Sequence, residues 1–298
     1  MYTVFLREAK QEPLLEVGSK ALYLAKIIDE GVTIPNGYIL KAEALRQFMN
    51  KHELHNELEH EAFVKAFEQA TIPAEMEAEI LASFQKLKEL TGDADLKVAV
   101  RSSSSAEDLA DASFAGQYDT ILNVREEGLL DAVKQCWASV FSEHARNYAV
   151  QKNISLEEFP MGILIQQMVN PDVAGVIFSM NPITDSQDEI IINASYGLGE
   201  AIVSGIVTPD TYIVHKETKA IERDLGLKEV KILPNGDGLI EVETPQDECD
   251  VYCLEDDSIL ELTAVTKKLE QFYAFPVDVE FAVKDGIAYV LQSRPITA

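Results

Sequence analysis

The chain has 298 residues, 47% of them hydrophobic, which is enough for one large domain or two smaller ones. Its 25 basic residues stand against 51 acidic ones, and the formal net charge of −26 disfavours nucleic acids and anionic membranes as partners. Any site for a phosphorylated ligand therefore needs a local group of basic residues.

Cysteine content and the N-terminal segment indicate the compartment. The three cysteines, Cys136, Cys249 and Cys253, form no disulfide framework, and their odd number fits a reducing cytosol. Cys249 and Cys253 could be neighbours on a helix, but no histidine or further cysteine completes a metal-binding set. No signal-peptide core and no apolar run of about 20 residues is present. We therefore expect a cytoplasmic protein.

The first 90 residues or so have a helical period. Leu22, Ala25 and Ile28 share one stripe of a first helix, which ends at Gly31. Three more helices are predicted over the segments KAEALRQFM, 53–70 and PAEMEAEILASFQKLKEL.

The remainder of the chain reads mainly as strands. They are predicted over 96–103, 117–124, 162–169, 173–179, 188–194, 210–216, 229–233 and 239–243, with helices over 126–152 and 257–273. A helix-rich first part before a β-rich second part predicts an α+β fold with two lobes, 1–169 and 170–298. A site between lobes is the default expectation.

The segment VAVRSSSSAEDLADASFAGQYDT has the features of an anion site. Arg101 is predicted to end a strand, Ser104 and Glu107 fit a capping box at the start of a helix, and Gly116 precedes the next strand. A cation beside the unpaired N–H groups of a helix start can hold an anion. The alternative is a capped helix whose arginine pairs with a nearby acid.

Single polar residues elsewhere add further candidates. Lys20 lies at the start of the first helix, where it can reach a phosphate or simply be solvated. Gln166 and Gln167 interrupt an apolar strand, so one of them can pair with a base edge, or both can serve only the backbone around them. The glycine-rich segment SYGLGEAIVSG contains Glu200 but matches neither the Walker nor the dinucleotide pattern.

The C-terminal segment VDVEFAVKDGIAYVLQSRPIT predicts a β-hairpin around Asp285-Gly286. Two registers are conceivable, and a three-residue loop over 284–286 aligns all the apolar side chains of both strands. We therefore expect this loop, since burial of the apolar row favours it by about 1 kcal/mol or more per large side chain. It places Glu280, Gln292 and Arg294 together on the opposite face.

These three residue types suit a metal-bound phosphate. Mg²⁺ binds oxygen ligands, commonly one or two carboxylates together with substrate phosphates, so Glu280 and Gln292 are a reasonable pair. Arg294 can hold the phosphate that the ion bridges. Together with Lys20 and Arg101 it would supply the basic group that an acidic protein needs.

Three long motifs carry a resemblance to a known family. They are VAVRSSSSAEDLADASFAGQYDTILNV, GLGEAIVSGIVTPDTY and VDVEFA…YVLQSRPIT. In this order and spacing they resemble the nucleotide-binding module of phosphoenolpyruvate synthase, pyruvate phosphate dikinase and rifampin phosphotransferase. The resemblance covers essentially the whole chain, and it implies an ATP-grasp fold whose two lobes grip ATP in a cleft.

The resemblance also implies roles for individual residues. Lys20 and the flanking Gly18-Ser19 and Ala21 stand where relatives usually have Gly-Gly-Lys-Gly. The implied phosphate-binding residues are Lys20, Arg101, Gly116, Thr120 and Arg294, and Arg101 and Arg294 are the implied catalytic residues. The resemblance also implies that Gln166 lies near the adenine and that Glu280 and Gln292 hold Mg²⁺. Glu200 lies in the matching glycine-rich segment.

The implied reaction passes the β-phosphoryl group of ATP to a histidine on a swivelling carrier domain, leaving AMP, and pyruvate is one final acceptor. The carrier motif is absent, because none of the five histidines follows two glycines. The carrier is then either another part of a longer enzyme or a separate polypeptide. Other possibilities are a carboxylate–amine ligase, which would yield ADP, an antibiotic kinase module, and a regulator that binds nucleotide without catalysis.

Overall fold

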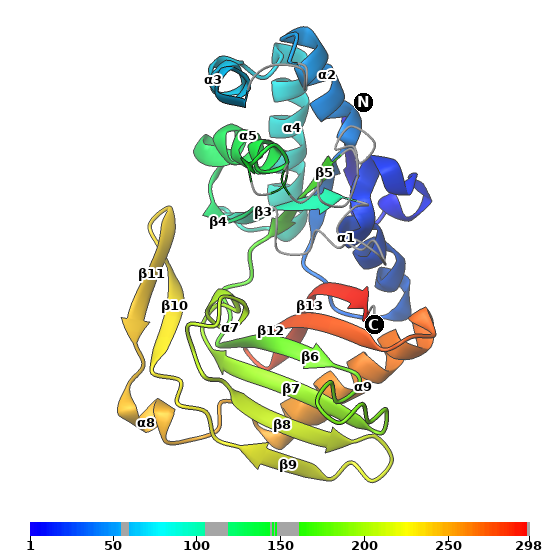
Figure 1. Cartoon of the computed structure of the whole chain (residues 1–298), viewed down its shortest axis with the longest axis vertical. Helices are drawn as coiled ribbons and strands as arrows, with labels where there is room; N and C mark the ends of the chain where they lie inside the picture. The colour runs from blue at the N-terminus through cyan, green and yellow to red at the C-terminus, as the bar shows by residue number, and fades with distance from the viewer. Residues whose placement is uncertain (55–59, 105–118, 144, 146, 148–160, 297–298) are drawn as a thin grey trace. The chain divides into compact units, whose positions relative to one another are not determined.

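The computed structural model describes residues 1–54, 60–104, 119–143, 145, 147 and 161–296 (Figure 1). It divides into two compact units. Unit 1 comprises residues 1–25 and 36–168, and unit 2 comprises residues 26–35 and 169–298. Each unit is built on its own antiparallel sheet, so the α+β class predicted from the sequence is confirmed.

Unit 1 contains a five-stranded sheet in the order β1-β2-β5-β3-β4. Its strands are β1 (Thr3–Phe5), β2 (Gly37–Leu40), β3 (Val98–Ser104), β4 (Thr120–Val124) and β5 (Met161–Gln167). Its helices are α1 (Leu14–Ile27), which runs on into unit 2, α2 (Ala42–Lys51), α3 (His60–Gln69), α4 (Ala74–Thr91) and α5 (Leu129–Ser139), with short 3₁₀ turns η1 (Ala9–Gln11) and η3 (Glu126–Gly128).

One face of this sheet carries the core of unit 1. Val98 and Val100 of β3 and Ile163 and Ile165 of β5 project to the same side, because alternate residues of a strand share a face. They join a buried cluster with apolar side chains of α2, α4 and α5, including Trp137. The residues that alternate with them in β3 and β5, Arg101 among them, therefore belong to the opposite face.

Unit 2 contains a six-stranded sheet in the order β13-β12-β6-β7-β8-β9. The strands are β6 (Val173–Phe178), β7 (Glu189–Tyr196), β8 (Asp210–His215), β9 (Ile221–Asp224), β12 (Val277–Lys284) and β13 (Ile287–Pro295). The other elements are η2 (Ile28–Glu30), α7 (Glu200–Val203), a separate two-stranded sheet of β10 (Val230–Asn235) and β11 (Gly238–Glu243), α8 (Gln246–Cys249) and α9 (Asp256–Tyr273).

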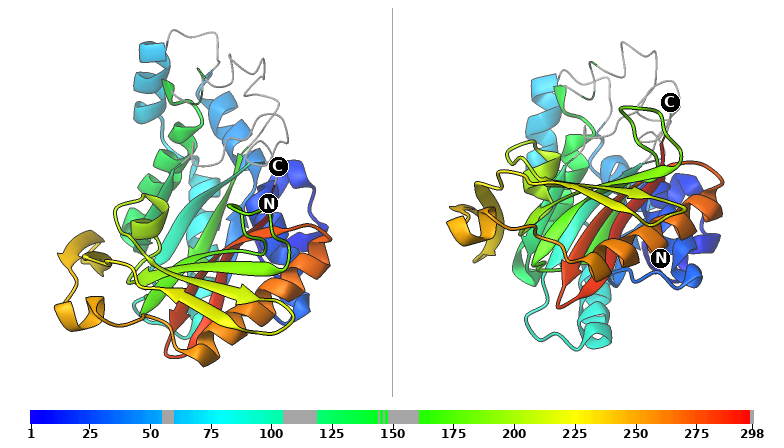
Figure 2. Two further views of the ribbon diagram at one scale, coloured as in Figure 1. Left: turned by 60° about the horizontal axis from the view of Figure 1, so that its bottom comes forward. Right: turned by 90° about the horizontal axis from the view of Figure 1, so that it is seen from below.

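Helix α9 covers one face of the six-stranded sheet, as Figure 2 shows. Ile259, Leu262 and Leu269 form its buried stripe. The side chain of Glu270 in α9 accepts a hydrogen bond from Ser179 Oγ at 3.1 Å, at the end of β6. The buried apolar residues of β12, which are Val277, Val279, Phe281 and Val283, face α9, and Asp278 and Glu280, which alternate with them, belong to the other face.

Most predicted elements are present, but the helix predicted over 126–152 ends at Ser139, as α5, and three strands were missed. These are β1, β2 and β9. The prediction that Arg101 ends a strand is wrong, because β3 continues through three buried serines to Ser104. The helix predicted after Ser104 lies in 105–118, outside the described residues.

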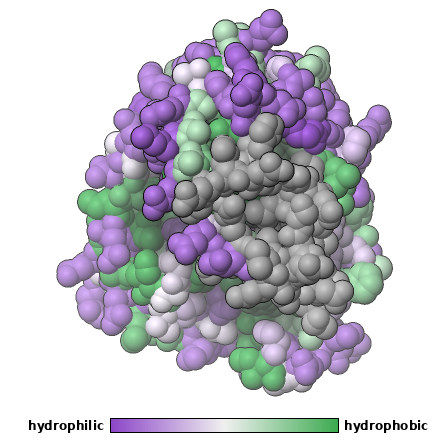
Figure 3. Space-filling view, turned by 45° about the horizontal axis from the view of Figure 1, so that its top comes forward, coloured by the Kyte–Doolittle hydropathy of each residue, from purple (hydrophilic) through white to green (hydrophobic). Residues whose placement is uncertain are grey.

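The described surface is rich in hydrophilic residues, and the described helices are not long and apolar enough to cross a membrane. Hydrophilic residues, drawn in purple, cover much of the described surface in Figure 3, in keeping with the 51 acidic residues. None of the helices described here has the length and apolar character required to cross a bilayer.

Candidate functional site

In unit 1, the segment that carries Lys20 is fastened to the end of β3. Gly18 has a φ of 74°, and a Cβ on it would lie 2.0 Å from the carbonyl oxygen of Ser103. Only glycine allows this close approach. The approach lets the Lys20 ammonium donate a hydrogen bond to the carbonyl oxygen of Ser102 at 2.9 Å. Lys20 is thus held at the end of a strand.

Ser19 and Ala21, which stand where relatives usually have glycine, both take part in this attachment. Ser19 Oγ donates a hydrogen bond to the carbonyl oxygen of Ser104 at 2.9 Å. The backbone N–H of Ala21 donates to Ser103 Oγ at 3.0 Å. The loss of the two glycines therefore does not displace the lysine between them.

Three more predicted residues of unit 1 share one face of its sheet. Arg101 lies directly opposite Thr120 of β4, and Ala99, two residues before Arg101, lies opposite Gln166 of β5. Cross-strand partners share a face, as do residues two apart in a strand. Arg101, Thr120 and Gln166 therefore lie on the face opposite the core, and the Lys20 segment packs on the same face at Ser103.

Gln166 has the properties expected of a ligand-binding amide. Its side chain is only 2% exposed, and its Nε2 makes no hydrogen bond within the described residues. A buried amide without a partner is costly, so such groups commonly bind a ligand or water. Gly116, which was also predicted to lie here, falls outside the described residues.

In unit 2, the closing hairpin has a different loop from the predicted one. Asp285 and Gly286 have φ values of 50° and 76°, and Lys284 pairs directly with Ile287. Two positive φ values form a two-residue type I′ turn, whose twist matches that of the strands. The predicted three-residue loop is therefore wrong.

A bulge farther along the hairpin nevertheless brings the polar residues together. Phe281 pairs with Val290 but Glu280 pairs with Gln292, so β13 contains one extra residue at this point. Beyond the bulge, Asp278 pairs with Arg294. The prediction that Glu280, Gln292 and Arg294 share a face is confirmed.

Arg294 is held by an acid that the sequence analysis missed. Its Nε and Nη2 donate hydrogen bonds to Asp278 Oδ2 at 3.0 and 2.8 Å. Both side chains are partly exposed, at 34% for Arg294 and 17% for Asp278. The strand period could have identified Asp278, because it lies two residues before Glu280. The ion pair fixes the direction in which the guanidinium projects.

Glu280 and Gln292 fit a magnesium ion that shares its coordination with a substrate. Directly paired residues of antiparallel strands have Cβ atoms about 5 Å apart, so the two side chains can offer oxygens to one ion. No group of three or more His, Cys, Asp or Glu side chains suited to a metal occurs among the described residues. The pair therefore suits an ion that takes its other ligands from phosphate and water.

Glu200 lies on the same face of unit 2. It begins α7, and Gly199 just before it packs against Ala174 of β6. Ala174 pairs with Ala282, which projects on the same side as Glu280 two residues away. The glycine-rich segment is therefore placed over the polar face of the sheet.

Comparison with known proteins gives a consistent result. The family described as the AMP/ATP-binding domain of pyruvate phosphate dikinase matches residues 14–298. An uncharacterized phosphotransferase of Bacillus subtilis, YvkC, is 43% identical over 298 residues, covering 100% of this chain and 35% of that protein. The probable phosphoenolpyruvate synthase of Methanocaldococcus jannaschii is 34% identical, covering 99% of this chain and 27% of that protein.

A third relative has another named activity. The rifampicin phosphotransferase of Bacillus cereus is 31% identical, covering 99% of this chain and 36% of that protein. The chain thus spans about a third of the length of these relatives. Among solved structures, the D-alanine–D-alanine ligase of Bacillus anthracis covers 94% of this chain and 60% of its own at 10% identity, with a TM-score of 0.33.

Proposed function

Because this chain belongs to the family of pyruvate phosphate dikinase AMP/ATP-binding domains, we propose that it passes a phosphoryl group from ATP to a histidine on a separate carrier domain. The overall reaction would be that of a phosphoenolpyruvate synthase, in which pyruvate, ATP and water give phosphoenolpyruvate, AMP and phosphate. The two units would correspond to the two lobes of an ATP-grasp module, which the sequence predicts over 1–169 and 170–298; residues 26–35, within the predicted first lobe, belong to unit 2.

The convergence of Glu280, Gln292 and Arg294 on one face of the closing hairpin is the observation that carries this proposal. A carboxylate, an amide oxygen and a guanidinium together suit a metal-bound polyphosphate. Arg294 would donate N–H groups to the phosphoryl group as its charge redistributes during transfer, and Asp278 would keep the guanidinium aimed. Arg101 would act in the same way from unit 1.

The remaining residues of unit 1 would bind the nucleotide. Lys20 and Thr120 would contact phosphate oxygens, and Gln166 would pair its buried amide with the edge of the adenine. Glu280 and Gln292 would hold Mg²⁺, which, when bound, neutralises phosphate charge. Glu200 would lie beside the phosphates.

A second candidate keeps the same ATP half-reaction and changes the final acceptor. The rifampicin phosphotransferase of Bacillus cereus matches almost the whole chain at 31% identity, which supports an antibiotic kinase module as the alternative. A nucleotide sensor without catalysis is disfavoured, because it has little need for the metal ligands together with Arg294.

A labelling experiment tests the proposal. The chain is mixed with Mg²⁺, ATP labelled in the β-phosphate and the histidine-carrier domain of a relative. We expect label on the carrier and AMP as the nucleotide product, with no label on a carrier whose histidine is replaced by alanine. Formation of ADP with transfer of the γ-phosphate would place the chain among ligase-type enzymes. Tight ATP binding without any transfer would indicate a regulator.

A further inference from the structure

The polar face of the six-stranded sheet continues beyond the hairpin. Glu280 of β12 lies opposite Val176 of β6, Val176 lies opposite Asn193 of β7, and Asn193 lies opposite Thr211 of β8. These strands can be followed in Figure 1 from β12 to β8. Because cross-strand partners share a face, Asn193 and Thr211 form a second polar position in the same row as Glu280.

The Asn193 amide is fixed by its neighbour in one orientation. Thr211 Oγ1 donates a hydrogen bond to Asn193 Oδ1 at 2.9 Å, which occupies the carbonyl end of the amide. Within the described residues, Asn193 Nδ2 has no acceptor. Both side chains are half-buried. The amide NH₂ group of Asn193 is left with both of its N–H donors unused in the described part of the chain, which suits an anion.

A second unpartnered donor lies on the same face of β7. Ser195 is only 2% exposed, and its Oγ makes no hydrogen bond within the described residues. It lies two residues from Asn193, opposite Ala174 of β6. A buried hydroxyl without a partner carries a desolvation penalty, as Gln166 Nε2 does in unit 1. Strand β7 therefore turns two unused donors toward one side.

The spacing of the row suits a polyphosphate. Adjacent strands lie about 4.8 Å apart, so roughly 10 Å separates the backbones at Glu280 and Asn193. Metal–oxygen distances of about 2.1 Å and a hydrogen bond of about 2.9 Å can cross this gap through a phosphate group. Between the two positions the face carries only Val176, which is partly exposed.

We propose that Asn193 is a further phosphate-binding residue of this site, and that Thr211 is a positioning residue for it. Asn193 Nδ2 donates to an oxygen of the β- or γ-phosphate of the ATP whose metal is held by Glu280 and Gln292. Thr211 keeps the amide in the donor orientation. The inference rests on the proposed function, since it takes Mg·ATP as the ligand.

Calorimetric titration of the whole chain with Mg·ATP and with AMP tests the inference. A hydrogen bond to a charged oxygen is strong, so Asn193→Ala should weaken Mg·ATP binding about tenfold while AMP, which lacks the outer phosphates, binds as before. Thr211→Val should weaken Mg·ATP binding about threefold. Thr211→Ser keeps the hydroxyl group and should bind Mg·ATP as tightly as the wild type. Asn235→Ala, in the separate β10–β11 sheet, is the matched control and should change neither affinity.

An isosteric variant guards against a folding defect. Asn193→Asp keeps the shape but replaces the donors with a negative charge, so it should weaken Mg·ATP binding more than Asn193→Ala does, with an unchanged unfolding temperature. Wild-type affinity for Mg·ATP in both Asn193 variants would overturn the inference and leave the proposed function intact. Failure of the wild-type chain to bind Mg·ATP would overturn both.

Discussion

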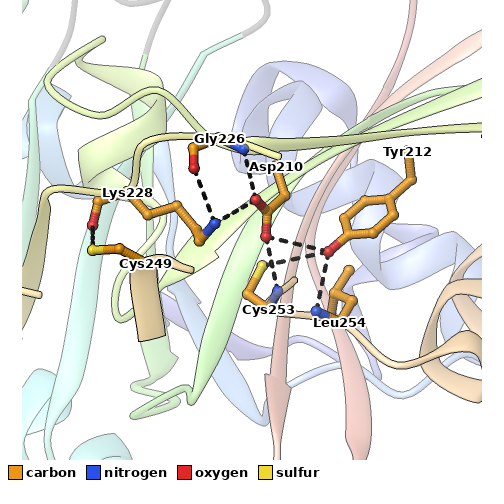
Figure 4. A network of polar contacts seen from close by, with 7 residues as sticks. All are labelled: Asp210, Tyr212, Gly226, Lys228, Cys249, Cys253 and Leu254. Carbon is orange, nitrogen blue, oxygen red and sulfur yellow. Dashed lines mark hydrogen bonds and ion pairs between the residues drawn. The ribbon is translucent and has the colours of Figure 1, made fainter. Parts of the chain in front are cut away.

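Two ion pairs in unit 2 contain similar residues but differ in environment. Lys228 and Asp210 are completely buried, with both side chains 0% exposed. Besides Lys228, Asp210 accepts hydrogen bonds from the backbone N–H groups of Gly226 and Cys253, both at 2.8 Å, and from the Tyr212 hydroxyl at 3.4 Å (Figure 4). Arg294 and Asp278, by contrast, are partly exposed and lie beside Glu280 and Gln292, the proposed metal ligands.

The difference separates a structural pair from one that we propose to act in phosphoryl transfer. The Asp210 network contains a lysine, an acid, a tyrosine and two cysteines, which are residue types common in active sites. Its carboxylate is nevertheless fully occupied, and burial raises the pKa of the Cys253 thiol, with a smaller contribution from the charge of Asp210. Burial likewise raises the pKa of Tyr212. Both groups stay protonated at neutral pH, so neither the Cys253 thiol nor the Tyr212 hydroxyl serves as a nucleophile, and the network joins segments of the chain.

Breaking the buried pair should have the largest effect. Lys228→Met leaves Asp210 as an unpaired buried charge, and we expect the free energy of unfolding to fall by about 3–5 kcal/mol in urea titrations. Adding Asp210→Asn to this variant removes the charge but keeps an oxygen acceptor, so it should recover part of the loss. A loss below about 1 kcal/mol in Lys228→Met would contradict the structural role.

The exposed pair should respond in the opposite way. Arg294→Ala should slow phosphoryl transfer to the carrier about 100-fold to 1,000-fold, because it removes donors aimed at the transferred group. The free energy of unfolding should change by less than about 1 kcal/mol, since the pair with Asp278 is partly solvated. Arg294→Lys keeps the charge without the planar fork and should give an intermediate rate. Unchanged turnover in Arg294→Ala would remove this residue from the site.

Replacing Glu280, the proposed metal ligand, should have a smaller effect that depends on magnesium. Glu280→Gln keeps the shape of the side chain and removes its charge, so half-maximal ATP binding should require about tenfold more Mg²⁺. Glu222→Gln, an exposed acid on the same face in β9, is the matched control and should leave the Mg²⁺ requirement unchanged. An unaltered requirement in Glu280→Gln would argue against the assignment.

The hairpin shows why the sequence predicted the polar face correctly from an incorrect loop. The expected loop had one residue too many, and the bulge opposite Glu280 added one residue to β13. The shorter loop and the inserted residue each shift the alternation of β13 by one position. Together they restore it, so Glu280, Gln292 and Arg294 still share a face. A period of two can indicate which residues belong together, but it does not reveal an inserted residue within a strand.

Other features depend on contacts that local patterns do not contain. Strand β2 is buried on both faces, so it has no polar alternation to detect. The serines after Arg101 remain in β3 because the 18–21 segment, some 80 residues away in sequence, supplies their partners. Lys228 resembles a surface lysine until Asp210 is placed beside it. Periodicity therefore predicted the elements and one polar face, and long-range pairing determined the remainder.

A third ion pair, on the hairpin turn, should give the smallest effect and shows how exposure limits such pairs. Asp172 accepts hydrogen bonds from the Lys284 ammonium at 2.8 Å and from the backbone N–H of Asp285 at 3.0 Å. The Lys284 ammonium, and next the Asp285 N–H, lower the pKa of Asp172 below its usual value. A lowered carboxyl pKa stabilises the fold above the unfolded-state pKa, and this contribution disappears as the pH falls through the folded-state pKa.

Asp172→Asn should therefore lower the free energy of unfolding slightly at neutral pH, because water screens this exposed pair. The difference between wild type and variant should vanish under acidic conditions, once Asp172 is protonated in both the folded and the unfolded state. Urea titrations between pH 2 and pH 7 measure this. Lys284→Met removes the ammonium but leaves the Asp285 N–H. The free energy of unfolding of this variant should therefore depend less on pH than that of the wild type. A difference that stays constant with pH would mean that the carboxylate charge does not stabilise the turn.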